Sequence, residues 1–397
     1  MTYSKRLLFI LPIFALNLSA DSILSSWFTE YSGQYARIYE TAADESALNS
    51  VTTWSHPNNG SGQALPTYAG VHEIAYTETN VYIRTSGLGF HIMGPWYLNE
   101  ERTNLFPNYP SNTSAIFRFP RVPGAPPISK TATGNGAIGY FVDGIGMFDS
   151  RDAFSYSNSN AGDARPNSNF TGDGIWNRDA YVNESVTFDS AHAHQAGINH
   201  HYHANPPALR HLIGDSVDYD ASTNTYTENF NGQHSPIMAW VRDGYPVYGP
   251  YGYDDPDDAT SAVRRMITGY ATRDGSNGTT NLNDTGRNSL PNWAAVVQGI
   301  NAALTTNQYG PAVGAAYPLG HYIEDYDYLG HLGLTLGSDF DLDEHNGRFC
   351  KTPEYPDGIY AYFVSIDALG TPIYPYNIGR TFYGSPTGAT VSTLPAN

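Results

Sequence analysis

The chain has 397 residues and a formal net charge of −18, because its 38 aspartates and glutamates outnumber its 20 lysines and arginines. So acidic a protein should repel nucleic acid and anionic lipid surfaces, and we expect neither as a partner. The single cysteine, Cys350, excludes an internal disulfide and is expected to be a small buried residue. Abundant tyrosine, glycine and proline favour strands and turns over long helices.

Residues 1–20 have the features of a secretory signal peptide. Lys5 and Arg6 precede an apolar run that is too short to span a membrane comfortably, and small residues follow it. No later stretch is long and apolar enough for a membrane helix, so we expect no membrane anchor. The sequence predicts a periplasmic or secreted protein, with a polar lead-in over residues 21–70 and a single β-rich domain over residues 71–397.

The pattern of apolar runs and turns predicts a mainly β fold, an antiparallel sandwich or barrel-like domain with long irregular loops and few short helices. Strands are expected at Val71–Tyr76 and at residues 81–85, 116–120 and 359–366, and helices at residues 41–48, Pro207–Leu212 and 291–304.

Two segments of the chain resemble each other. Residues 138–148 and 238–248 each contain an apolar strand, an Asp-Gly pair and a second short strand. Asp-Gly between strands is a strong hairpin signal, because both turn positions accept positive φ. The segments therefore predict two equivalent hairpins of a pseudo-symmetric core, with Asp143 and Asp243 as turn residues.

Five of the 13 histidines lie between residues 192 and 203. His192 and His194 are two apart, as are His201 and His203, and residues two apart in a strand point to the same face. A glycine and an asparagine between the pairs suit a turn. A hairpin would bring both pairs to one point and form a site for zinc or copper, which imidazole suits. A solvated hairpin without a ligand would show the same pattern.

Asp189 and Glu344 are the candidate acid–base residues. Either carboxylate can orient a ligand imidazole or act as a general base. His200 has the opposite parity to His201, so we expect it to face away from the site. The alternating aspartates of residues 339–343 resemble a calcium loop, but the EF-hand spacing is not met, and we expect a solvated acidic turn there.

In combination, these motifs resemble the YHYH family of exported bacterial proteins, named for a tetrapeptide that reads His-His-Tyr-His at residues 200–203 here. The resemblance also covers residues 137–148, 234–253 and 342–364. It implies an exported, β-rich protein and brings no established activity. It further implies cysteines at two places that Ser190 or Ala191 and His345 occupy here, so that a family disulfide would be absent. His345 then becomes a further candidate metal ligand.

Two functions of different classes remain open. The first is a metalloenzyme that acts on a small-molecule or glycan substrate, by hydrolysis if the metal is zinc and by oxidation if it is copper. The second is a non-catalytic extracellular module that binds metal or glycan. The many aromatic side chains would suit a sugar platform, although aromatic residues more often pack in a core.

Overall fold

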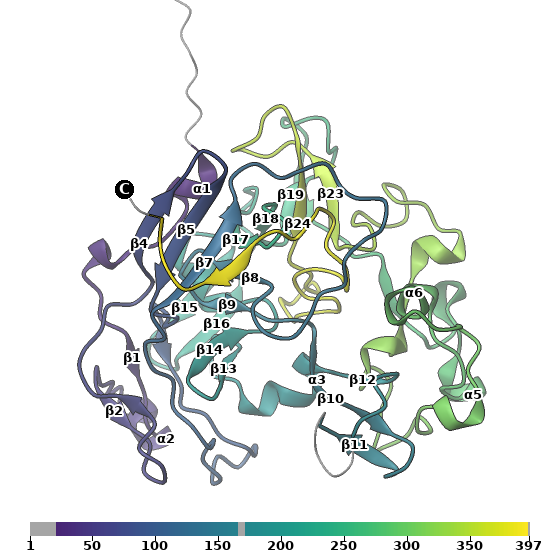
Figure 1. The fold of residues 1–397 in the computed structure, drawn as a ribbon, viewed down its shortest axis with the longest axis horizontal. Coiled ribbons are helices and arrows are strands. Elements are labelled where there is room, and N and C mark those ends of the chain that lie inside the picture. Colours follow the sequence, from purple (N-terminus) through teal and green to yellow (C-terminus); the bar gives the residue numbers. More distant parts are fainter. Residues whose placement is uncertain (1–20, 166–170, 396–397) are drawn as a thin grey trace, which may run out of the picture.

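The computed structural model describes residues 21–165 and 171–395 (Figure 1). The expected signal peptide lies outside the described residues. The described residues form short strands, a few short helices and long loops, which confirms the mainly β fold. Most strand pairs are antiparallel, and none of the sheets in the described part of the chain closes into a barrel. In the same part, no helix is both long enough and apolar enough to cross a membrane.

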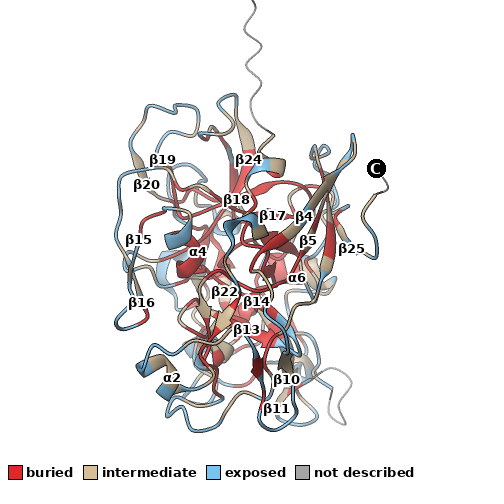
Figure 2. Ribbon diagram, turned by 90° about the vertical axis from the view of Figure 1, so that its left-hand side faces the viewer, coloured by how far each residue is buried: buried red, intermediate tan, exposed pale blue. Residues whose placement is uncertain are grey.

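An eight-stranded sheet forms the centre of the molecule, with the strand order β13-β14-β9-β8-β17-β18-β24-β23. Its strands are β8 (Gly139–Phe141), β9 (Gly146–Met147), β13 (Ala193–Ala196), β14 (Asn199–Tyr202), β17 (Ile237–Val241), β18 (Pro246–Tyr248), β23 (Gly347–Cys350) and β24 (Ile359–Phe363). The strands β8, β17 and β18 are buried throughout and belong to the largest apolar cluster (Figure 2). They form a buried core that the outer strands flank on both sides.

Smaller sheets surround this core. A four-stranded sheet contains β4 (Val71–Tyr76), β5 (Asn80–Thr85), β7 (Ala115–Pro120) and β25 (Ala389–Val391), and a three-stranded sheet contains β10 (Arg151–Ser157), β11 (Gly162–Ala164) and β12 (Asn177–Asp179). The two-stranded sheets pair β1 (Arg37–Ile38) with β6 (Ile92–Met93), β2 (Trp54–Ser55) with β3 (Gly62–Gln63), β15 (Val217–Asp220) with β16 (Thr225–Glu228), β19 (Tyr251–Tyr253) with β20 (Val263–Arg265), and β21 (Tyr270–Thr272) with β22 (Tyr326–Tyr328).

The helices are short: α1 (Ser22–Ser25), α2 (Ala42–Ser46), α3 (Ala180–Glu184), α4 (Pro207–Leu212), α5 (Leu282–Thr285) and α6 (Asn292–Gln298). The expectation of a helix that continues to residue 304 was wrong, because Gly299 adopts φ +67° and ends α6. The lead-in contributes to the interior, since Ile23 and Trp27 pack in the central cluster. Cys350 is free and buried, as expected.

The two predicted hairpins, β8–β9 and β17–β18, form and lie side by side through the antiparallel pair β8–β17. Both Asp-Gly aspartates are buried and accept a tyrosine hydroxyl. Tyr202 donates to Asp143 Oδ2 at 3.1 Å, and Tyr362 donates to Asp243 Oδ2 at 2.6 Å. The aspartates therefore anchor the outer strands in addition to making the turns.

The register of the outer strands completes the internal repeat. β14 runs parallel to β9 with Tyr202 opposite Met147, and β24 runs parallel to β18 with Tyr362 opposite Val247. Each outer strand then pairs with an edge strand in the same register, β13 on one side and β23 on the other. Corresponding positions in the first and second halves are His194 and Arg348, His200 and Tyr360, His201 and Ala361, and His203 and Phe363. None of these four histidines has a histidine at the corresponding position of the second half.

Candidate metal centre

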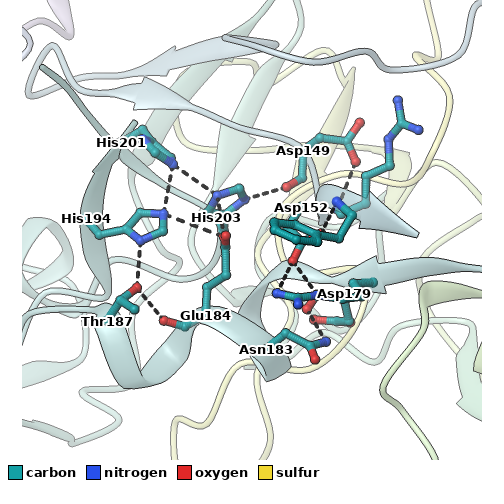
Figure 3. Close-up of polar contacts among 12 residues, drawn as sticks. Asp149, Asp152, Asp179, Asn183, Glu184, Thr187, His194, His201 and His203 are labelled. Atoms are coloured by element: carbon teal, nitrogen blue, oxygen red, sulfur yellow. Dashed lines mark hydrogen bonds and ion pairs between the residues drawn. The ribbon is translucent and has the colours of Figure 1, made fainter. Parts of the chain in front are cut away.

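Three imidazoles meet on one face of the β13–β14 hairpin. His194 and His201 lie directly opposite each other in the register, and His203 follows His201 by two residues on the same face. The Nε2 atom of His201 lies 3.1 Å from Nε2 of His194 and 3.0 Å from Nε2 of His203 (Figure 3). All three side chains are buried. We call these three residues the histidine triad.

Backbone carbonyl groups fix the tautomers of two triad members. Nδ1 of His201 lies 3.0 Å from the carbonyl oxygen of Asn199, and Nδ1 of His203 lies 2.7 Å from that of Asp149. A carbonyl oxygen only accepts hydrogen bonds, so both Nδ1 atoms carry the proton and donate. The ring of His201 also stacks on Phe148, with 3.9 Å between the ring centroids, which holds its orientation.

The third triad member has the same tautomer for a different reason. Nδ1 of His194 lies 2.7 Å from the hydroxyl of Thr187, which itself donates to the carbonyl oxygen of Glu184 at 2.6 Å. The hydroxyl proton is therefore engaged, and His194 must donate to Thr187. As a result, all three Nε2 atoms carry lone pairs that face one another. Such hydrogen bonding from the far ring nitrogen is typical of histidines that ligate metals.

The triad is neutral around neutral pH. Burial lowers the pKa of His203, and burial together with the neighbouring imidazoles lowers the pKa values of His194 and His201 well below the usual range. A neutral imidazole is the form that binds a metal ion, so protons compete little with a metal at this site.

Glu184, the last residue of α3, brings a carboxylate to the triad. Its Oε2 atom lies 3.4 Å from Nε2 of His203 and 3.6 Å from Nε2 of His194. Burial raises the pKa of Glu184 to about 7. A carboxyl group with this pKa can exchange a proton near neutral pH or provide a fourth ligand. Sequence reasoning missed Glu184, because nothing in the spacing of α3 from the histidines indicates that they meet.

A cavity of about 620 Å³ opens over the triad and Glu184. Its wall includes apolar side chains, arginines and two aspartates, namely Leu98, Phe106, Phe148, Phe154, Arg151, Arg165, Arg178, Asp149 and Asp152. Arg178 is paired with Asp152, whose carboxylate lies 2.6 Å away. The cavity is large enough for a small molecule to approach the Nε2 side of the imidazoles.

The other residues predicted for this site lie elsewhere. His192 precedes β13 with φ +62°, so the two-residue alternation does not extend to it, and its Nδ1 atom donates to the carbonyl of Asn205. His345 lies in the second half, where Nδ1 contacts Thr381. Glu344 pairs with His331 at 3.2 Å, and Asp189 lies beside His91 and His200 instead of the triad. The structure thus brings three of the five candidate ligands together, and both candidate carboxylates, Asp189 and Glu344, lie outside this site.

Comparison with known proteins identifies a family. The model of the family described as YHYH protein matches residues 116–374, a span that contains all eight strands of the central sheet and the triad. No curated protein and no solved structure matches the chain. Since the matched region covers more than half of the sequence, the chain belongs to the YHYH protein family.

Proposed function

We propose that this protein binds one transition-metal ion, zinc or copper, at His194, His201 and His203. The observation that carries the proposal is the set of three neutral Nε2 atoms that face one another at 3.0 and 3.1 Å without a proton donor between them. Their lone pairs repel at this distance. A tetrahedral zinc ion about 2.0–2.1 Å from each nitrogen would hold them roughly 3.4 Å apart and remove the repulsion.

A catalytic use of the ion is favoured by the cavity. Zinc with three histidine ligands lowers the pKa of its bound water and polarises a substrate oxygen, which favours hydrolysis, whereas copper would favour oxidation. Glu184 supports the catalytic use, because a carboxyl group with a pKa of about 7 can accept and return a proton. The apolar side chains of the wall, together with its arginines and carboxylates, suit a small organic molecule with polar groups.

A non-catalytic metal-binding module is the second candidate. It is favoured by the burial of the triad and by the reach of Glu184, which is close enough to act as a fourth ligand and close the site.

Both versions of the proposal include export of the protein, which is inferred from residues 1–20. An intact-mass measurement of the native protein should show an N-terminus near residue 21.

A zinc and copper titration tests the proposal directly. Protein purified without a histidine tag and stripped with a chelator should compete with a chromophoric chelator for at least one ion. At a free zinc concentration 100-fold above Kd, the folded state should gain about 2.7 kcal/mol, seen as a higher thermal midpoint. A chain that binds neither ion would overturn the proposal. If the protein does bind zinc, a turnover assay with ester or phosphoester substrates distinguishes the enzyme from the non-catalytic binding module.

A further inference from the structure

A second group of possible ligands lies on the opposite face of the same hairpin. His200 alternates with His201 in β14 and therefore points the other way, where it meets His91 and Asp189. One ligand atom from each of the three lies within 4.8 Å of the others. His91 immediately precedes β6 and Asp189 lies in the loop before β13, so three separate segments converge. We call these residues the second cluster.

The imidazole of His200 is buried among aromatic rings, including that of Trp96. The residue is 3% exposed, and neither ring nitrogen makes a hydrogen bond within the described part of the chain. The Nε2 atom of His91 also lacks a hydrogen bond, and its nearest carboxylate oxygen, Oδ2 of Asp189, is 3.4 Å away. Burying polar atoms without partners is costly, so these nitrogens point to a missing ligand.

The second half of the sheet shows the same position without such a cluster. Tyr360 takes the place of His200, and its hydroxyl donates to Asp343 at 2.9 Å. Asp343 corresponds to Asp189, because Oδ1 of each accepts two backbone N–H groups of its own loop. The residues at the corners of these loops, His192 and Asn346, share a positive φ of 62° and 65°. At equivalent positions of the two halves, Tyr360 therefore has a hydrogen bond to its aspartate, whereas His200 has none and lies next to His91.

We propose that His91, Asp189 and His200 bind a second zinc ion. Two imidazoles and one carboxylate are a suitable ligand set for zinc, and the carboxylate supplies a negative charge that offsets part of the charge of the ion. Gly94 N–H donates to Asp189 Oδ2 at 2.9 Å and orients the carboxylate. The ion would fasten β14 to the segments before β6 and β13. It would therefore brace the hairpin that carries the triad, and it does not depend on metal binding at the triad.

The variant His200→Tyr provides the sharpest test, because the scaffold already accommodates tyrosine at the equivalent Tyr360. Zinc titration of the tag-free full chain, followed by native mass spectrometry, should give two equivalents for the wild type and one for His200→Tyr. The remaining equivalent should disappear only when His201→Ala is added. Asp189→Asn, whose amide oxygen can still accept the loop N–H groups, should also lose one equivalent.

The matched control is His211→Ala, since His211 contacts the carbonyl of Val217 away from both clusters, and it should keep two equivalents. Retention of two equivalents by both His200→Tyr and Asp189→Asn would overturn the second site. A wild type with one equivalent that only His201→Ala removes would overturn it as well. Conversely, one equivalent that only His200→Tyr removes would support the second site while contradicting the proposed function of the triad.

Discussion

Zinc affinity at the triad is expected to fall by more than about 100-fold when His201 is replaced by Ala or His203 by Phe. Each change removes one of three ligands, and even the loss of a residue that only orients a ligand typically costs about 10–100-fold. The second half of the sheet carries Ala361 and Phe363 at the same positions, so both replacements suit the scaffold. Competition with a chromophoric chelator measures the loss, while circular dichroism verifies that the variants fold.

The best controls are the two candidate ligands that the structure leaves outside the triad. His192→Ala removes a member of a His-x-His motif, and His345→Ala removes the histidine beside Glu344, yet neither imidazole reaches the triad. Both variants should retain the zinc affinity of the wild type at this site. If His194, His201 and His203 were each dispensable while His192 was required, the geometric assignment of the ligands would be contradicted.

The positions of the histidines could be predicted where regular strand geometry applies. The hairpin and its two-residue alternation place His201 and His203 on one face and His200 on the other, as the sequence indicated. The alternation fails at His192, because the loop before β13 is held by the hydrogen bonds of Asp189 and requires a left-handed residue there. A local constraint on the backbone therefore decides which histidines meet.

Long-range packing accounts for what the sequence did not reveal. The Asp-Gly pairs predicted both hairpins, because a turn is specified by neighbouring residues. Glu184 reaches the triad because α3 packs against β10 and β12, and no local pattern encodes that contact. The same holds for His91, which is far from His200 in sequence but close in space. Local reasoning could not decide whether the strands close into a barrel, and the sheets of the described residues are open.

Glu184→Gln is expected to stabilise the metal-free protein at about pH 8 and to lose this advantage towards about pH 5. Burial raises the pKa of Glu184 to about 7, whereas a glutamate in an unfolded chain has a pKa of about 4.3. Between these values the folded wild type binds a proton that the unfolded chain does not. Wild-type stability therefore rises relative to the variant as the pH falls.

The side chain of Glu184 is 23% exposed, and solvent screening reduces the effect. We expect the difference in unfolding free energy between the two proteins to change by about 2 kcal/mol over this pH range. Urea denaturation of both proteins in the presence of a chelator measures it. A difference that does not change with pH would contradict a buried carboxyl group with a raised pKa.

At about pH 8, zinc should act against the advantage that Glu184→Gln has in the metal-free protein. A cation at the triad stabilises the ionised carboxylate, whose Oε2 atom lies 3.4 Å from Nε2 of His203, and it offers no such gain to the neutral amide. Zinc should therefore raise the thermal midpoint of the wild type more than that of Glu184→Gln. Both proteins should carry His200→Tyr, which removes the proposed second zinc site, so that only zinc at the triad is measured. Equal zinc-induced shifts in that background would place the ion beyond the reach of Glu184, and the carboxylate could then be neither its fourth ligand nor the proton acceptor beside it.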